Sequence, residues 1–211
     1  MVNIVKSKAP EMPFKYNDAA VVEQIRDDFF VLCYICEDFT PRHFEVDHFY
    51  PQKHFSELEN SWDNLFYSCQ KCNKIRPKNI NTTGNEVLNN CTDDVENIIT
   101  IYYDSDSNKV RIRSDKTSRN VKNTIDLLNK IYNGIDTTSK DSVFLRNEIK
   151  NEIADFNALL EKNAKAKGFF KNAIKQRLSK KTKSEKSSFV SFKRQIIKES
   201  FEYKEFIEFF D

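Results

Sequence analysis

Apolar residues recur at helical spacing in several stretches of the chain. Residues 19–30 place Val21, Ile25 and Phe29 four positions apart, which predicts a helix. Longer stretches of the same kind follow in the C-terminal half, with the apolar faces Val121, Ile125, Leu128 and Tyr132; Leu145, Ile149, Ile153, Phe156 and Leu160; and Phe170, Ile174 and Leu178. Asn133-Gly134 is a helix-stop signal. The pattern therefore predicts a mostly helical C-terminal region.

A different pattern precedes these helices. Apolar and aromatic residues fill 98–103, a polar run occupies 104–108, and 109–113 alternates basic and aliphatic side chains. This order predicts a β-hairpin with a polar loop. Residues 1–20 contain Pro10 and Pro13 and are expected to form an irregular arm.

The end of the chain is unusually aromatic. We expect a final helix over 189–210, preceded by a polar, basic connector at 179–188 that is able to detach. The apolar surface of this helix is too wide to leave in water, at about 25 cal/mol per Å². It must pack on the chain's own helices, on a second copy in a homo-oligomer, or on a partner subunit.

Composition narrows the class of protein. With 39% hydrophobic and 31% charged residues, the chain is expected to be a soluble globular protein rather than a disordered one. It lacks an apolar run of the roughly 18–20 residues that span a membrane, so we expect no membrane contact. Residues 1–6 lack the apolar core of a signal peptide. The expected location is the cytoplasm.

Positive charge is concentrated in one segment. Residues 1–100 carry 10 Lys and Arg against 16 Asp and Glu, a net charge of −6. Residues 162–198 carry 13 Lys and Arg against a single acid, a net charge of +12. Such a segment is typical of contacts with phosphate backbones, and the alternative is a solvated helix face.

Four of the five cysteines form two Cys-x-x-Cys pairs, Cys33/Cys36 and Cys69/Cys72. A two-residue gap lets both thiolates of a pair reach one ion at about 2.3 Å, and two pairs complete a tetrahedron. In a cytoplasmic chain this predicts a structural zinc site, and the alternative is a set of buried free thiols with one redox pair. We expect Cys91 to be a packed thiol.

The residues between and after these pairs form a recognisable constellation. Asp47-His48 is followed by Pro51, Asn64-Leu65 precedes the second cysteine pair, and Asn73 directly follows the last cysteine. In this order and within about 44 residues, the pattern resembles the HNH, or ββα-metal, endonucleases. The resemblance implies two short strands carrying Asp47-His48 and a helix that begins near Cys72.

The resemblance and the chemistry together give each residue a role. His48 has a near-neutral intrinsic pKa and suits a general base that activates water at pH 7. Asp47 and Asn73 offer hard oxygen ligands for a catalytic Mg²⁺ or Mn²⁺. Asn64 corresponds to the middle Asn, which braces the loop bearing the base. Because neighbouring strand residues point to opposite faces, the strand must be distorted for Asp47 and His48 to act together.

Basic residues in two places are candidate nucleic-acid contacts. Those just past the metal ligand are Lys74, Arg76 and Lys78, and those in the basic segment are Lys171, Lys175, Lys180 and Lys181. Purely structural roles are the alternative for two of these residues, since Asn73 is also suited to capping a helix and Asn64 to a turn. His43 is expected to be a loop residue, with contact to substrate or a supporting role near the metal as the alternative, and His54 is expected on the surface.

A looser resemblance covers residues 30–150. The order of cysteine-rich module, Val87 to Asp94, hairpin, Thr124 to Asn129 and Leu145-Arg146 is similar to the small HNH subunit of Septu-type prokaryotic antiviral systems, also found with retrons. Those subunits pair with an ABC-type ATPase. The resemblance implies a prokaryotic defence effector with such a partner.

These observations predict an α+β fold: a zinc-stabilised ββα-metal module with a β-hairpin, followed by a mostly helical region. We expect an N-terminal arm and helix over 1–30, the nuclease module over 31–115, and the helical region over 116–211. The predicted activity is endonucleolytic cleavage of DNA, or alternatively RNA, leaving 5′-phosphate and 3′-hydroxyl ends as the resemblance implies. The competing hypotheses are a non-catalytic zinc module that binds nucleic acid and an effector held silent by a partner subunit.

Overall fold

The computed structural model describes residues 1–40, 42–77, 79–134, 140–183 and 187–210. Its regular elements, in chain order, are α1 (Ala19–Asp28), β1 (Phe44–His48), η1 (Ser56–Leu58), η2 (Trp62–Asn64), β2 (Leu65–Cys69), α2 (Gln70–Ile75), α3 (Val95–Ile98), β3 (Thr100–Asp104), β4 (Lys109–Arg113), α4 (Arg119–Asn133), α5 (Lys140–Lys165), α6 (Gly168–Thr182), α7 (Val190–Glu199) and η3 (Lys204–Phe209). Across the described ranges, none of the helices is both long enough and apolar enough to cross a membrane.

A two-stranded hairpin followed directly by a helix forms the cysteine-rich part of the chain. β1 and β2 pair antiparallel, with Phe44 opposite Cys69 and His48 opposite Leu65, and α2 begins at the next residue after β2. All five residues of β2 are buried. A strand covered on both faces needs packing from several elements, and Phe29, the residue that follows α1, supplies part of it against Phe66. This ββα arrangement confirms the predicted α+β fold class.

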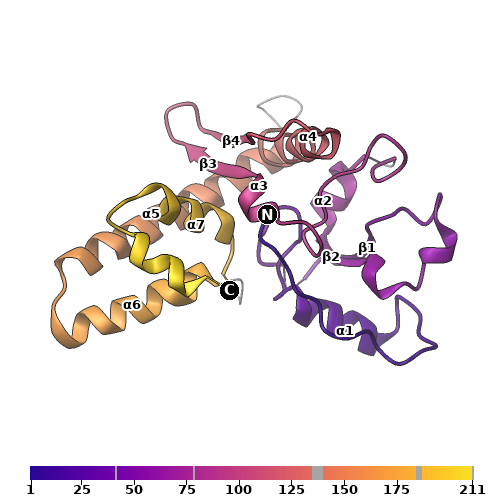
Figure 1. The fold of residues 1–211 in the computed structure, drawn as a ribbon, viewed down its shortest axis with the longest axis horizontal. Coiled ribbons are helices and arrows are strands. Elements are labelled where there is room, and N and C mark those ends of the chain that lie inside the picture. Colours follow the sequence, from indigo (N-terminus) through magenta and orange to yellow (C-terminus); the bar gives the residue numbers. More distant parts are fainter. Residues whose placement is uncertain (41, 78, 135–139, 184–186, 211) are drawn as a thin grey trace.

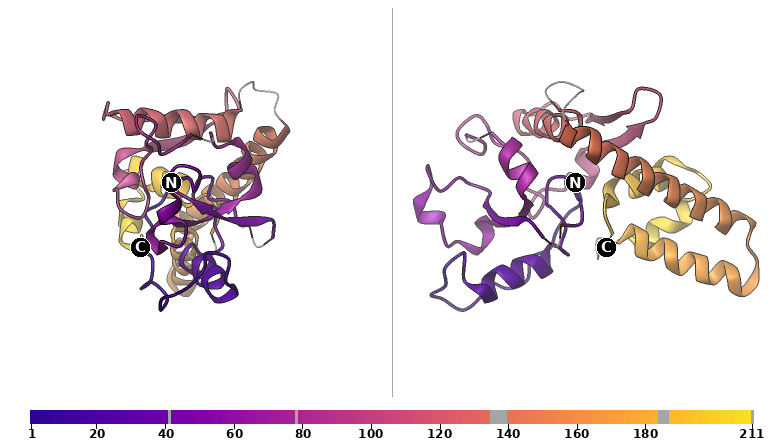
Figure 2. Two further views of the ribbon diagram at one scale, coloured as in Figure 1. Left: turned by 90° about the vertical axis from the view of Figure 1, so that its right-hand side faces the viewer. Right: turned by 180° about the vertical axis from the view of Figure 1, so that it is seen from behind.

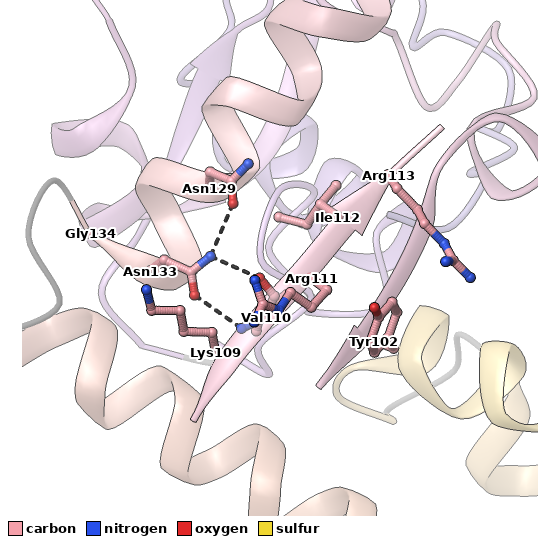
Figure 3. Close-up of a pocket in the computed structure, with 9 residues that line it drawn as sticks. All are labelled: Tyr102, Lys109, Val110, Arg111, Ile112, Arg113, Asn129, Asn133 and Gly134. Atoms are coloured by element: carbon pink, nitrogen blue, oxygen red, sulfur yellow. Dashed lines mark hydrogen bonds between the residues drawn. The ribbon is translucent and has the colours of Figure 1, made fainter. Parts of the chain in front are cut away.

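The second hairpin packs on α4 and confirms the predicted β-hairpin. β3 and β4 pair antiparallel from Thr100 opposite Arg113 to Asp104 opposite Lys109. Asn133, the last residue of α4, binds both the amide and the carbonyl of Val110 (Figure 3). Gly134 then ends the helix with a φ of 78°, a left-handed backbone angle that glycine adopts without steric cost.

The helices after residue 140 form an arm. α5 and α6 lie side by side and extend away from the β1–β2 module, and α7 lies against their inner ends (Figures 1 and 2). Two hydrophobic clusters follow this division. The larger one runs from the N-terminal segment through β2 and α4 to Phe192, and the smaller one joins Phe156, Leu178 and Phe206 within the arm.

The end of the chain differs from the single helix predicted for 189–210. The segment divides into α7 and η3, with a break at Ser200 to Tyr203. Phe189 and Phe192 enter the larger cluster and Phe206 the smaller one, so two separate burial sites bend the chain between them. The bulk of the aromatic surface therefore packs on the chain's own elements, while Phe201 stays 89% exposed.

α6 extends into the connector predicted at 179–188, of which residues 184–186 lie outside the described ranges. α6 continues through Thr182, whose hydroxyl donates to the carbonyl of Leu178 one turn earlier. Leu178 and Thr182 are both fully buried. Burial at this spacing extends the helix through a sequence whose composition alone suggested a polar link.

Candidate functional site

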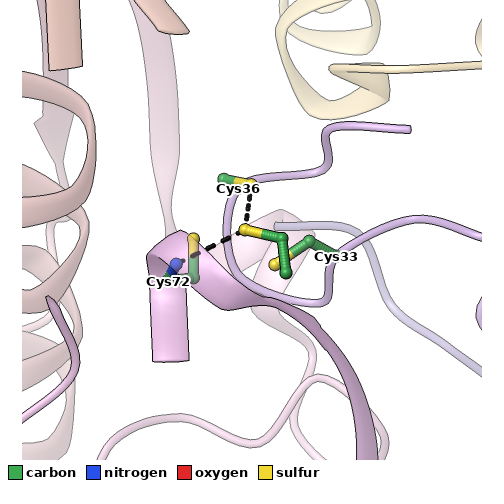
Figure 4. A group of neighbouring side chains, drawn as sticks. Cys33, Cys36 and Cys72 are labelled. Atoms are coloured by element: carbon green, nitrogen blue, oxygen red, sulfur yellow. Dashed lines mark hydrogen bonds between the residues drawn. The ribbon is translucent and has the colours of Figure 1, made fainter. Parts of the chain in front are cut away.

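The four paired cysteines meet in one buried cluster. Cys33 and Cys36 lie in the turn after α1, Cys69 ends β2, and Cys72 lies in the first turn of α2 (Figure 4). Their four sulfur atoms lie within 4.8 Å of one another, and the Cys36 and Cys69 sulfurs are 3.9 Å apart. The Cys69 sulfur also accepts a hydrogen bond from the Cys72 amide and caps α2. The cluster therefore joins the turn, the strand and the helix at one point.

This geometry fits a tetrahedral zinc ion. Zn–S bonds of about 2.3 Å place tetrahedral sulfurs about 3.8 Å apart, close to the separation of Cys36 and Cys69. The hydrogen bond with Cys33 raises the pKa of Cys36 well above its ordinary value, because neighbouring buried thiols cannot share several negative charges. A divalent cation at the centre balances the thiolates. The four cysteines thus form a candidate structural zinc site.

Asp47 and His48 lie on opposite faces of β1. The ladder with β2 is regular up to its end, with Asp47 opposite Phe66 and His48 opposite Leu65. The expected distortion of the strand is not present, since this pairing continues through both residues. Asp47 therefore faces the turn that carries Cys33, and His48 faces the loop between the strands.

Both oxygens of the Asp47 carboxylate are engaged. Tyr34 donates its hydroxyl to Oδ2 at 3.0 Å, and Arg76 donates to Oδ1 at 2.5 Å. Asp47 is 3% exposed, and burial raises its pKa to about 6 although the Arg76 charge acts in the opposite direction. Arg76 also donates to the His48 carbonyl at 3.3 Å. The end of α2 is thus tied to the last two residues of β1.

His48 has a defined tautomer. Its Nε2 lies 2.9 Å from the Glu59 carbonyl oxygen, which only accepts hydrogen bonds, so Nε2 carries the proton of the neutral ring. Burial lowers the pKa of His48 below its ordinary value, and Tyr16 packs edge-on against the ring at 4.9 Å. The ring is therefore neutral at pH 7, with Nδ1 as its proton-accepting nitrogen.

Asn64 fastens the loop that follows β1. Its Oδ1 accepts from the Tyr50 amide at 2.6 Å, and its Nδ2 donates to the carbonyls of Tyr50 and Leu58, each at 3.1 Å. The side chain is 2% exposed. These three bonds fix the loop whose Glu59 carbonyl holds His48, so Asn64 supports the histidine without touching it.

Asn73 lies on α2 beside Glu45 rather than beside Asp47. Its Nδ2 donates to Glu45 Oε2, and Glu45 stands two residues before Asp47 on the same face of β1. Within the described ranges, no hydrogen bond joins Asp47 to Asn73. The oxygen donors suit Mg²⁺ or Mn²⁺ by their chemistry. In this arrangement Arg76 pairs with the Asp47 carboxylate, and the assignment of Asp47 and Asn73 as cation ligands stays a prediction.

The predicted phosphate contacts fall into two groups. Lys74, Lys171 and Lys180 form no ion pair within the described part of the chain, and Lys74 and Lys180 are exposed. Three others form ion pairs: Arg76 with Asp47, Lys175 with Glu205 at 2.9 Å, and Lys181 with Glu152 at 3.0 Å. Lys78 lies outside the described residues.

The sequence pattern did not single out three residues at this site. Tyr34 lies between the first two cysteines and binds Asp47, Glu45 binds Asn73, and Tyr16 of the N-terminal arm covers His48. Strand alternation from Asp47 was a signal for Glu45. Tyr16 had no such signal, because only a tertiary contact brings the N-terminal segment of residues 1–20 against His48. His43 and His54 are both exposed, as expected for loop and surface residues.

Comparison with known proteins bears on this part of the chain. A search of curated proteins finds no significant match. Residues 33–78 match a family model described as HNH endonuclease. The matched segment contains both cysteine pairs, β1, β2 and α2, together with His48 and Asn64. Over residues 33–78, this match confirms the resemblance to HNH endonucleases that the sequence pattern indicated.

Proposed function

We propose that the chain is a metal-dependent endonuclease that hydrolyses phosphodiester bonds of nucleic acid, with DNA favoured over RNA. The main support for this proposal is the environment of His48, which lies inside the segment that matches the HNH family. Its ring is neutral at pH 7 and is held by a hydrogen bond to the Glu59 carbonyl. A residue positioned in this way accepts a proton from water at pH 7, which phosphodiester hydrolysis requires.

The other residues of the domain take supporting roles in this proposal. Asn64 keeps the loop closed so that the Glu59 carbonyl fixes the histidine ring. Asp47 and Asn73 are the proposed ligands of Mg²⁺ or Mn²⁺, which supplies charge neutralisation at the phosphate. Each Asp47 oxygen already accepts one hydrogen bond, and the Arg76 charge lies beside the carboxylate, so a cation there competes with Arg76.

A non-catalytic zinc module is the main competing function. Such a module needs the cysteine cluster and a basic surface, but it has no use for a buried neutral imidazole with one fixed tautomer. The four buried sulfurs support zinc equally under both functions. The two functions are distinguished only by measuring whether the chain cleaves nucleic acid.

A finer proposal concerns the biological role. The looser resemblance over residues 30–150 supports a cytoplasmic effector in prokaryotic antiviral defence, paired with an ABC-type ATPase. The exposed Phe201 and Phe169, at 89% and 82%, offer apolar contact area for a partner or a second copy. Co-expression with an ATPase encoded beside it, followed by co-purification, tests this role separately from catalysis.

The decisive experiment for catalysis is cleavage of plasmid DNA and of total RNA by the purified chain. We expect cleavage with Mg²⁺ or Mn²⁺, none with chelator, and none in His48→Ala. Product ends are tested with a ligase, which joins 5′-phosphate to 3′-hydroxyl ends. Equal cleavage by wild type and His48→Ala would identify a contaminant and leave the binding module as the function.

A further inference from the structure

A cleft with a cationic rim lies between α5 and α6, outside the HNH domain. It has a volume of about 690 Å³. Its described lining residues are Asp155, Phe156, Ala158, Leu159 and Lys162 of α5, with Arg177, Lys180, Lys181, Lys183 and Ser187 in and after the end of α6. Four exposed cations surround it, Lys162, Arg177, Lys180 and Lys183. Asp155 is the one acidic side chain among the described lining residues.

These four cations have no partner within the described part of the chain. Lys181, which also lines the cleft, pairs with Glu152 at 3.0 Å. Lys175, six residues earlier on α6, pairs with Glu205 at 2.9 Å. By contrast, the side chains of Lys162, Arg177, Lys180 and Lys183 form no ion pair or hydrogen bond among the described residues. The concentrated charge is therefore available to an external anion.

A second cationic hollow beside β4 is different in this respect. It has a volume of about 500 Å³ and includes Arg111 and Arg113 (Figure 3). Arg111 pairs with Asp104 at 2.9 Å and Arg113 with Glu199 at 3.7 Å, so neighbouring acids already balance both charges. Lys109 also lines this hollow and has no ion pair among the described residues, so the hollow offers one unpaired cation where the α5–α6 cleft offers several.

The size and floor of the cleft indicate more than a bare phosphate. Phe156 and Leu159 contribute to its lining and are themselves buried in the arm, so part of the surface is apolar. Cavities of roughly 300–1,000 Å³ hold ligands the size of a nucleotide. A base needs an apolar surface and its phosphate needs cations, and this cleft provides both.

We propose that the α5–α6 cleft binds a nucleotide unit of a nucleic-acid strand, with Lys162, Arg177 and Lys180 holding its phosphates. This deepens the proposed nuclease function, because the same strand is the substrate of the HNH domain. The arm projects away from that domain, so the cleft holds the strand at a point removed from the cleaved bond (Figure 1). Its contribution is to affinity and not to the chemical step.

The test measures binding of a fluorescein-labelled 20-nucleotide single strand by anisotropy. The full zinc-loaded chain carries His48→Ala and is kept without added Mg²⁺, so the probe stays intact. The cleft variant combines Lys162→Glu, Arg177→Glu and Lys180→Glu. We expect affinity to fall by at least about tenfold, and the slope of log affinity against log salt to fall by about 2, at about 0.7 per phosphate contact.

The matched control combines Lys150→Glu, Lys165→Glu and Lys167→Glu. These lysines lie on the same arm and give the same total charge change, but they do not line the cleft. We expect the control to lose less than about threefold. Equal losses in both triple variants would show general attraction to a basic surface and overturn the cleft, as would unchanged binding in the cleft variant.

Two further measurements complete the design. Zinc content and thermal unfolding report whether each variant is folded, and a milder Lys162→Gln, Arg177→Gln and Lys180→Gln variant replaces the cleft variant if it is not. Competition by free ATP at micromolar concentration, without binding of the strand, would assign the cleft to a free nucleotide and refute the proposal. Failure of catalysis in the parent chain leaves this binding result unaffected, so the two proposals fail separately.

Discussion

Arg76 at the end of α2 forms an ion pair with Asp47 on β1, and both side chains are largely buried, at 9% and 3% exposed. The Arg76 guanidinium therefore binds the carboxylate that we predict to be a ligand of the catalytic cation. Arginine and a divalent cation are competing positive charges for the same oxygens. Their competition is measurable without any turnover.

Replacing Arg76 by Gln is expected to tighten Mn²⁺ binding by about tenfold. The reason is that a charge-assisted hydrogen bond of roughly 1.5–3 kcal/mol no longer opposes the metal. Losing the arginine charge raises the pKa of Asp47 further, so calorimetric titration belongs at pH 8, where the carboxylate stays ionised.

The matched control is Lys74→Gln, which removes an exposed charge from the same helix. We expect its Mn²⁺ affinity to equal that of the wild type, and Asp47→Asn to abolish the binding. Unchanged affinity in Arg76→Gln would mean that Asp47 does not bind the cation.

The sequence allowed the scaffold of the domain to be predicted in some detail. Two Cys-x-x-Cys pairs impose one meeting point, and the structure places their four sulfurs within 4.8 Å. The hairpin at 98–113 and the stop at Gly134 follow from short-range signals that need no tertiary knowledge. The hairpin and the stop are decided by residues that are neighbours in the sequence, and the cysteine cluster by a spacing that recurs in two separate segments.

The arrangement inside the site was less predictable, because it depends on partners far apart in the chain. Tyr34 and Arg76 take both oxygens of Asp47, and Asn73 binds Glu45 instead. A buried carboxylate must be paired, and the sequence does not say with which donor. The same limit applies to the aromatic tail, where two separate burial sites divide one apolar pattern into α7 and η3.

Cleavage is expected to depend on the neutral form of His48. Burial lowers its pKa below 6.5, so the ring is a proton acceptor above that pH and loses this capacity as pH falls through its pKa. The rate should be flat from pH 7 upward until another group titrates, and it should fall about tenfold per pH unit at the acid limit. A half-maximal rate above pH 7 would argue against His48 as the base.

Zinc should be required for folding and not only for activity. Cys69 is a proposed ligand and also caps α2, so Cys69→Ser removes two supports at once. We expect loss of about one zinc per chain and of cooperative unfolding, since structural zinc contributes on the order of 10 kcal/mol. Cys91→Ser, which lies outside the cluster, should retain the metal. Zinc bound at full stoichiometry by a Cys69→Ser, Cys72→Ser chain would refute the site.

The arm has its own electrostatic anchor, which gives a prediction independent of the nuclease site. Lys193 on α7 is 0% exposed and donates to Glu152 on α5 at 2.7 Å. Burial opposes ionisation of Glu152, but the hydrogen bond and charge of Lys193 outweigh it and lower the Glu152 pKa. Removing the carboxylate leaves a buried ammonium with only neutral partners, Ser187 and the Ser188 carbonyl.

Glu152→Gln is therefore expected to destabilise the fold by about 2 kcal/mol near pH 7. This is less than the roughly 3–5 kcal/mol of a fully buried pair, because Glu152 is 29% exposed and partly screened by solvent. A depressed acid pKa stabilises the fold above pH 4.5 and loses that effect as pH falls through the folded value, so the difference between wild type and variant should shrink below pH 4.5. Urea unfolding from pH 3 to 8 measures it, with the exposed Glu161→Gln on the same helix as control. A constant difference across this range would show that the lost contact is packing and not charge.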